Sequence, residues 1–198
     1  MINDKNLGKW AKIQRLTIDI AHVQRHHYIL GTDRHENVAE HSFSVAVLCL
    51  YIFDIVKPPL DLNKILKYAL LHDFTERGLK VDFSAFDNKK NRKKKVVVES
   101  EEMEKINKEF ADFTTLLQTL KSYDEREDEE SLFVWSIDKM QPIILGYMDD
   151  WRPYSEDNIS FASFCEKYDM VYEKCSPYVK DIFKEVYEKS KKTYYDKP

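Results

Sequence analysis

Two histidines and two aspartates occupy positions from which they could hold a single divalent cation. His41 stands in the first turn of an apolar stretch, and His72 with Asp73 closes another apolar run. Asp138 is one of the few charges in the largely apolar segment 132–140. Ionisable side chains in apolar helices are costly without partners, and imidazole and carboxylate together suit a divalent metal. The sequence therefore predicts a metal site built from three helices.

Glu76 adds a group that could act beside such a cation. It stands four residues after His72, so a helix would place it one turn away on the same face. A metal lowers the pKa of a water molecule, and a nearby carboxylate can accept the proton as that water attacks. This combination of residues indicates hydrolysis.

Each of these residues also has an ordinary structural interpretation. A single histidine such as His41 is more often a hydrogen-bonded core residue than a ligand. Asp73 could begin a helix, and Asp138 could pair with the lysine that follows it. Glu40 we assign to a capping box, because it stands three residues after a predicted N-cap at Asn37.

The elements that would position these residues are predicted to be helical. Apolar residues recur at three- and four-residue steps, and the chain has only four glycines. Residues 27–37 and 77–95 are expected to be connections. We expect an all-α, compact multi-helix bundle forming one domain over 1–198, with a core over about 5–150. Helices are expected over residues 5–27, 38–56, 61–71, 96–121, 128–149 and, in one or two pieces broken near 176–177, over 157–192.

Composition narrows the class of protein. The 198 residues fit one domain, with 43% hydrophobic residues, 33% charged residues and a formal net charge of -4. This mild acidity argues against a surface made mainly for nucleic acid or for an anionic membrane. The longest apolar run, residues 45–53, is shorter than the ~20 residues of a membrane span. Three cysteines without C-x-x-C spacing and an N-terminus without an apolar leader favour reduced thiols and a cytoplasmic location.

Three strings of residues in this order resemble a known family. They are Arg-His-Glu-Asn-Val-Ala-Glu-His-Ser at 34–42, Leu-His-Asp-Phe-Thr-Glu at 71–76 and Asp-Lys at 138–139. Together they resemble the HD-domain phosphohydrolases, and within them the bacterial 5′-deoxynucleotidase branch is the most similar. The first string makes this resemblance far more specific than a His-Asp pair alone.

The resemblance implies a fold, a metal and a reaction. It implies a compact helical bundle whose centre holds one divalent metal, with manganese, cobalt, iron, zinc and magnesium as candidates. Glu76 would position or deprotonate the attacking water. The substrate would be a small-molecule nucleotide, and members commonly form homodimers. The implied metal ligands are His41, His72, Asp73 and Asp138.

Substrate contacts follow less directly from the resemblance. The family places an arginine near the end of the first helix, against the substrate phosphate; Arg25 or its neighbour His26 falls there, and Arg34 is a further candidate. The Gly-Asp pair that usually follows the catalytic glutamate and contacts the sugar is absent. Asp82 could substitute for that aspartate one residue late, so the preference for deoxyribose is open.

The expected function is release of phosphate from (deoxy)nucleoside 5′-monophosphates by a metal-dependent phosphohydrolase. A triphosphohydrolase on the same scaffold is the first alternative, and a non-catalytic nucleotide-binding protein is the second. The basic run at 89–95 has six positive charges in seven positions but no aromatic residue for base stacking. It is interpreted as a solvated loop or as a mobile flap that attracts phosphate, and a nucleic-acid-binding module is the least favoured alternative.

Overall fold

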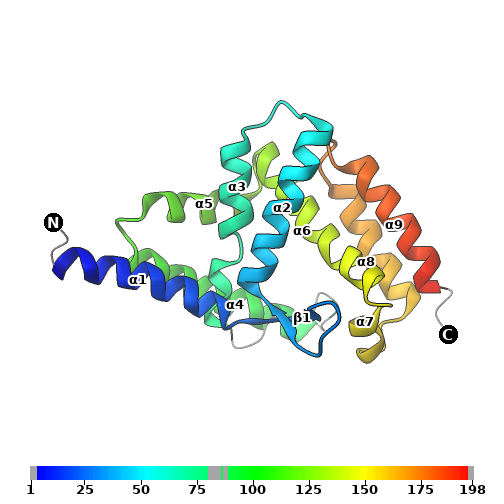
Figure 1. The fold of residues 1–198 in the computed structure, drawn as a ribbon, viewed down its shortest axis with the longest axis horizontal. Helices are drawn as coiled ribbons and strands as arrows, with labels where there is room; N and C mark the ends of the chain where they lie inside the picture. Colours follow the sequence, from blue (N-terminus) through cyan, green and yellow to red (C-terminus); the bar gives the residue numbers. More distant parts are fainter. Residues whose placement is uncertain (1–3, 80–85, 87–88, 196–198) are drawn as a thin grey trace.

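Helices make up most of the fold, and a two-stranded hairpin lies between the first two (Figure 1). The computed structural model describes residues 4–79, 86 and 89–195. The expected all-α class is confirmed. The elements are α1 (Asp4–Ala21), β1 (Gln24–Tyr28), β2 (His35–Asn37), α2 (Val38–Val56), α3 (Leu62–Leu71), the 3-10 helix η1 (Phe74–Gly78), α4 (Lys89–Glu109), α5 (Thr114–Glu125), α6 (Glu129–Met148), α7 (Arg152–Glu156), α8 (Phe161–Lys174) and α9 (Lys180–Tyr195).

Side chains cap the beginnings of the helices that carry the candidate ligands, and the first of them is the predicted N-cap Asn37. At α2 the Glu40 amide donates to Asn37 Oδ1 over 3.0 Å, and the Asn37 amide donates to Glu40 Oε2 over 2.9 Å, which confirms the capping box. Asp61 caps α3 by accepting from two backbone amides. Asp128 caps α6 in the same way, through the amide of Ser131.

The first predicted helix is too long. α1 ends at Ala21, and residues 24–28 form β1, which pairs antiparallel with β2. The run His-His-Tyr at 26–28 favours a strand over a helix, and Gly31 adopts a φ of 76° in the turn between the strands. The hairpin places Arg25 on a strand beside the start of α2.

The connection predicted over 77–95 is also wrong in part. Residues 74–78 form η1, and the basic run at 89–95 is the beginning of α4. Lysine and arginine are good helix formers, and acidic residues one turn later offset their repulsion, as where Lys95 Nζ lies 3.7 Å from Glu99 Oε1. The predicted helix 96–121 is divided, because α4 ends at Glu109 and α5 begins at Thr114.

The apolar interior forms two clusters, and α2 takes part in both. The larger cluster packs α2, α3 and α6 against α8 and α9, which lie on the right in Figure 1. The smaller one joins α1, η1, α4 and α5 with Val38 at the beginning of α2. His41 lies one turn after Val38, so the candidate site is placed where the two clusters meet.

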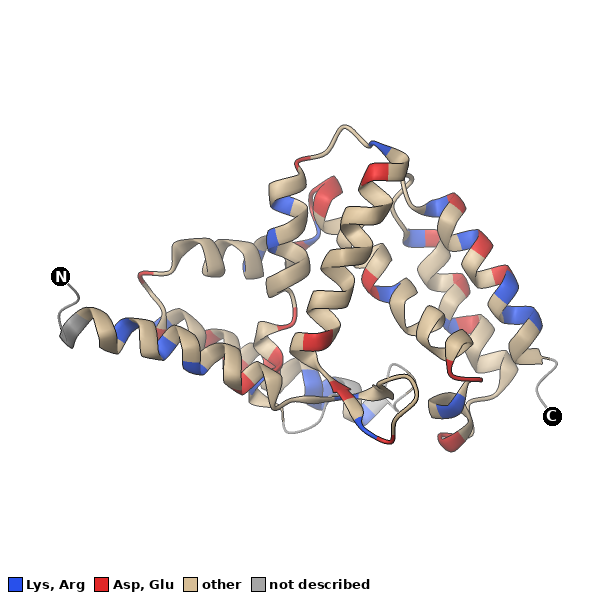
Figure 2. Cartoon of the chain, viewed as in Figure 1, with Lys and Arg blue, Asp and Glu red and all other residues tan. Residues whose placement is uncertain are grey.

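Among the helices that the structure describes, only α2 is long and apolar enough to cross a membrane by length and composition. Its acidic residues, Glu40 and Asp54, stand near its two ends (Figure 2). One side of α2 is part of the core, with Val45, Cys49 and Ile52 buried. These properties are those of a central core helix.

Gly146, in α6, provides a test of this packing. A Cβ atom there would lie 2.6 Å and 2.7 Å from ring carbons of Trp151 and 2.9 Å from the ring of Tyr154. Both rings are buried and cannot move aside freely, so Gly146→Ala is expected to lower the free energy of unfolding by about 1–3 kcal/mol. Thermal unfolding measures this change. Gly8→Ala is the control, because a Cβ there meets nothing within 4 Å and the helix should be unchanged or slightly stabilised; equal melting temperatures for the two variants would contradict the expected packing.

Candidate metal centre and phosphate site

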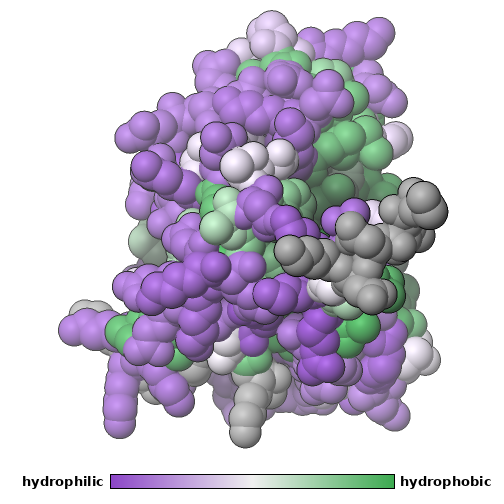
Figure 3. All heavy atoms as spheres, turned by 90° about the vertical axis from the view of Figure 1, so that its left-hand side faces the viewer, coloured by the Kyte–Doolittle hydropathy of each residue, from purple (hydrophilic) through white to green (hydrophobic). Residues whose placement is uncertain are grey.

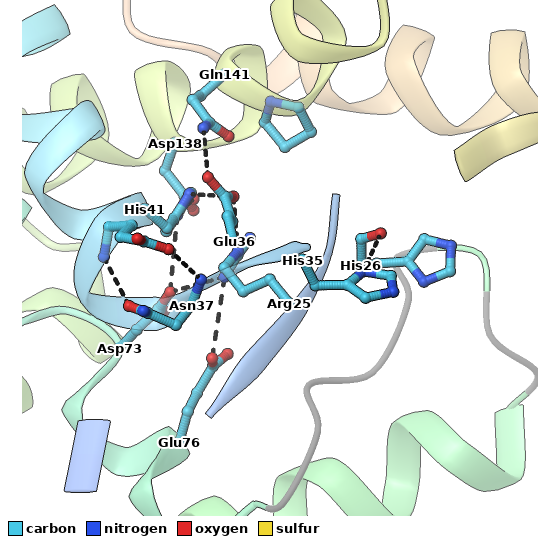
Figure 4. A network of polar contacts seen from close by, with 12 residues as sticks. Arg25, His26, His35, Glu36, Asn37, His41, Asp73, Glu76, Asp138 and Gln141 are labelled. Atoms are coloured by element: carbon cyan, nitrogen blue, oxygen red, sulfur yellow. Dashed lines mark hydrogen bonds and ion pairs between the residues drawn. The ribbon is translucent and has the colours of Figure 1, made fainter. Parts of the chain in front are cut away.

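Two histidines and two carboxylates from three segments converge at the candidate metal centre. His41 Nε2 lies 3.0 Å from Asp138 Oδ1 and 3.7 Å from Asp73 Oδ2, and His72 Nε2 lies 3.2 Å from Asp73 Oδ2 and 3.8 Å from Asp138 Oδ1. Figure 4 shows His41, Asp73 and Asp138 approaching one another. Two ligands that each lie about 2.1 Å from one metal ion are roughly 3.0–3.4 Å apart, so the spacings of 3.0 Å and 3.2 Å suit a shared cation, and the other two, at 3.7 Å and 3.8 Å, lie a few tenths of an ångström beyond that range.

The hydrogen bonds around His72 test whether this cluster suits a metal. Its Nδ1 lies 3.0 Å from the carbonyl oxygen of Ala69, which can only accept, so Nδ1 carries the proton. In the neutral ring Nε2 then has a free lone pair, and this buried atom makes no hydrogen bond with the residues described. His41, His72 and Asp73 offer ligand atoms that all lie within 4.8 Å of one another. The donor set therefore fits a divalent cation.

The charges within the cluster also favour a cation. Burial by itself would lower the pKa of His72, but without a cation the carboxylates of Asp73 and Asp138 outweigh it and raise that pKa to about 10, so that Nε2 holds a proton. A divalent cation bound there would take the place of that proton. Burial opposes ionisation of the two aspartates as well, yet His72 lowers the pKa of Asp73, and Lys139 with the histidines lowers that of Asp138. Both carboxylates are therefore ionised at neutral pH and attract positive charge.

Glu36 lies behind this centre and was not predicted from the sequence. Its side chain is buried, with Oε1 3.6 Å from His41 Nδ1 and 3.4 Å from Arg25 Nε. Gln141 Nε2 donates to its other oxygen over 3.4 Å (Figure 4). A carboxylate behind a ligating histidine can orient the ring through a hydrogen bond, and at 3.6 Å Glu36 lies just beyond that distance from His41. Glu36 belongs to the string at 34–42, but only the hairpin reveals that it faces both His41 and Arg25.

Of the predicted substrate contacts that the structure describes, only one lies at the candidate metal centre. Arg25 is largely buried, and its Nη1 lies 3.1 Å from Asp73 Oδ2 (Figure 4). His26 lines the same cavity but turns its Nε2 to Asp157, 2.7 Å away. Arg34 is exposed, forms two hydrogen bonds with Glu40 and does not line the cavity. Asp82 lies outside the described residues.

Glu76 lies beside the cluster at the middle of η1. Its amide donates to the Asp73 carbonyl over 2.9 Å, a turn that keeps Asp73 and Glu76 close together. The side chain is almost fully buried, with Oε1 2.6 Å from Lys95 Nζ and Oε2 3.9 Å from Arg25 Nη1. The sequence predicted Glu76 one turn after His72 on the same helix, but α3 ends at Leu71 and Glu76 lies in η1. The lysine that it contacts was not predicted.

The centre forms part of the wall of a cavity of about 850 Å³. The cavity reaches from Arg25 and Glu76 to residues of α4, α5, α6 and α8. Its wall combines aromatic rings with both cationic and acidic side chains. The rings include Phe86, Tyr123, Trp135, Tyr154 and Tyr168, and the cations besides Arg25 are Lys95, Lys121, Arg126, Lys139 and Lys167.

Comparison with protein families agrees with this geometry. Residues 19–179 match the HD domain, a span that contains all four candidate ligands and Glu76. The chain belongs to the HD domain family. A comparison with curated proteins gives no match.

Solved structures share the HD domain fold of this chain. A protein from Magnetospirillum magnetotacticum MS-1, described as a predicted metal-dependent phosphohydrolase, is 16% identical, with all of both chains covered and a TM-score of 0.81. The PH0347 protein from Pyrococcus horikoshii OT3 is 22% identical over 90% of this chain and 98% of its own, with a TM-score of 0.63. A conserved hypothetical protein from Pyrococcus furiosus is also 22% identical, over 90% and 99%, with a TM-score of 0.59. At these identities the likeness concerns the fold of the HD domain.

Proposed function

We propose that the chain is a cytoplasmic, metal-dependent phosphohydrolase that releases orthophosphate from (deoxy)nucleoside 5′-monophosphates. The observation that carries the proposal is the convergence of His41, His72, Asp73 and Asp138 beside Arg25 and Glu76, all of which except the fully buried His41 line one cavity. Membership of the HD domain family supports it, as does the fold shared with a protein described as a predicted metal-dependent phosphohydrolase.

Each group has a distinct task in this reaction. A divalent cation held by the two histidines and two aspartates would supply Lewis acidity and lower the pKa of the attacking water. Glu76 takes a proton from that water. At the same time the water oxygen forms a bond to phosphorus, and the bond from phosphorus to the 5′ oxygen breaks. The guanidinium of Arg25 offsets negative charge on the phosphoryl oxygens, which its planar fork matches.

The cavity wall favours a triphosphohydrolase as the second candidate. Lys95, Lys121, Arg126, Lys139 and Lys167 line the cavity in addition to Arg25. Carboxylates line the same wall, where Lys139 pairs with Asp138 and Lys95 pairs with Glu76. A chain of three phosphates could exchange such pairs for contacts with its own charges. The volume of about 850 Å³ also leaves room for a longer substrate.

Product analysis distinguishes these reactions. The chelated protein is reloaded with manganese, cobalt, magnesium or zinc and offered ribo- and deoxynucleoside mono- and triphosphates. Orthophosphate from the monophosphates supports the proposal, and tripolyphosphate or pyrophosphate from the triphosphates supports the second candidate. Nucleotide binding without any product, with metal bound, would overturn both and leave a nucleotide-binding protein.

The active form is proposed to be a homodimer joined through an exposed stripe on α2. This α2 stripe consists of Phe43, Val47, Leu50, Tyr51 and Ile55, each between 40% and 67% exposed. Its residues recur at helical spacing, and none of them is charged, so two copies would not repel each other. In Figure 3 hydrophobic surface gathers towards the upper right of the molecule. Two such stripes packed together would bury on the order of 1,000 Å², which reaches the lower limit for a stable interface.

Light scattering at micromolar protein concentration tests this assembly. The wild type is expected to have twice the mass of one chain, and Val47→Lys is expected to have the mass of one chain, because burying the lysine against a second stripe would cost several kcal/mol. Leu7→Lys, at an exposed apolar position near the start of α1, should remain dimeric. A monomeric wild type, or a dimeric Val47→Lys variant, would contradict the proposed interface.

A further inference from the structure

The basic run at 89–95 has one member that turns into the cavity. The run forms the first two turns of α4, and among its described side chains only Lys95 lines the cavity wall. Lys93 and Lys94 are exposed on α4. The helix therefore turns Lys95 towards the cavity and the neighbouring lysines towards solvent, although all of them belong to one run of positive charge.

Lys95 and Arg25 approach Glu76 on different oxygens. Lys95 Nζ lies 2.6 Å from Oε1, and Arg25 Nη1 lies 3.9 Å from Oε2. The Lys95 side chain is about three-quarters buried, and its Nζ also lies 3.7 Å from Glu99 Oε1. In this arrangement Lys95 forms a short ion pair with the carboxylate proposed to act on the attacking water.

We propose that Lys95 is a phosphate-binding residue that exchanges its ion pair with Glu76 for an ion pair with the substrate phosphate. This inference rests on the proposed function. A phosphate that contacts Arg25 lies within reach of the flexible Lys95 side chain, and it presents more negative charge than a single carboxylate. Once Lys95 moves to the phosphate, Glu76 Oε1 can accept the proton of the attacking water. The Glu76 carboxylate would thus become available as a base only when a phosphate is bound.

A purely structural role for Lys95 would be to join α4 to η1, but other residues already do this. Arg77, in η1, hydrogen-bonds through Nε to the buried Glu102 of α4. Its Nη2 also donates to Glu109 over 2.9 Å. Because these bonds do not involve Lys95, the loss of Lys95 should leave α4 in place.

Binding of inorganic phosphate to the manganese-loaded full chain tests the inference without turnover. By calorimetry, Lys95→Met is expected to bind phosphate at least about tenfold more weakly than the wild type, which corresponds to the loss of one charge-assisted hydrogen bond. Lys95→Arg should retain most of the affinity. Lys94→Met makes the same change in charge on the exposed face and should remain within about twofold of the wild type.

Kinetics and metal content complete the test. In Lys95→Met the KM for the preferred nucleotide should rise together with the inhibition constant of phosphate, while bound metal matches the wild type. Unchanged phosphate affinity in Lys95→Met, or an equal loss in Lys94→Met, would overturn the role of Lys95. A wild type that hydrolyses none of the nucleotides would overturn the proposed function, and the binding comparison would still decide on Lys95.

Discussion

Glu76→Gln is expected to reduce kcat by about 10²–10⁴-fold, the range typical for loss of a general base. Glutamine has nearly the same shape as glutamate but cannot accept a proton at neutral pH. Because Glu76 lies beside the four candidate ligands rather than among them, the variant should bind metal as the wild type does. Steady-state kinetics on the preferred nucleotide, with metal content measured on the same sample, gives both quantities.

Glu104→Gln provides the matched control for this variant. Glu104 also lines the cavity, but no contact joins it to the candidate metal centre, so its kcat should remain within about twofold of the wild type. A Glu76→Gln variant with kcat within tenfold of the wild type would contradict the assigned role. Loss of metal from this variant would instead make Glu76 a ligand.

Asp138→Asn is expected to abolish stoichiometric metal binding and, with it, activity. Asp138 Oδ1 lies 3.0 Å from His41 Nε2, and the carboxylate supplies negative charge that a neutral amide does not. Loss of an outer partner alone costs about 10–100-fold in metal affinity, so loss of a ligand should cost at least as much. Elemental analysis and calorimetry with manganese measure the effect.

Asp124→Asn makes the same chemical change at an exposed position on the cavity wall. This variant should bind one equivalent of metal with wild-type affinity. If Asp138→Asn also binds one equivalent with unchanged affinity, Asp138 is no ligand, and its pairing with Lys139 Nζ at 2.8 Å is then its whole role.

The residues at the centre could be predicted because each departs from its local pattern. His41 and Asp138 interrupt apolar helices, and His72–Asp73 ends another, so their partners had to come from elsewhere in the fold. The caps at Asn37 and Asp61 fixed where α2 and α3 begin. Local rules of this kind depend on a few neighbouring residues and can be applied to one sequence.

Glu36 and Lys95 could not be predicted, because their roles depend on contacts between distant segments. Glu36 faces His41 and Arg25 only because residues 24–28 form a strand. The helical spacing of apolar residues instead predicts a helix as far as residue 27. Lys95 meets Glu76 only because the basic run continues as a helix and packs against η1. The acidic residues that stabilise this helix stand one turn after the lysines. Counting the charges in the run does not reveal this spacing.

A metal titration measures most directly whether this centre carries out metal-dependent phosphate release. The protein is stripped with a chelator, and manganese is returned in steps while orthophosphate release from the preferred nucleotide is followed. The rate should be negligible without metal, rise in proportion to added manganese and level off at one equivalent per chain, and Asp138→Asn should show no such rise. Full activity in the stripped protein, or an equal rise in Asp138→Asn, would contradict a reaction at the centre formed by His41, His72, Asp73 and Asp138.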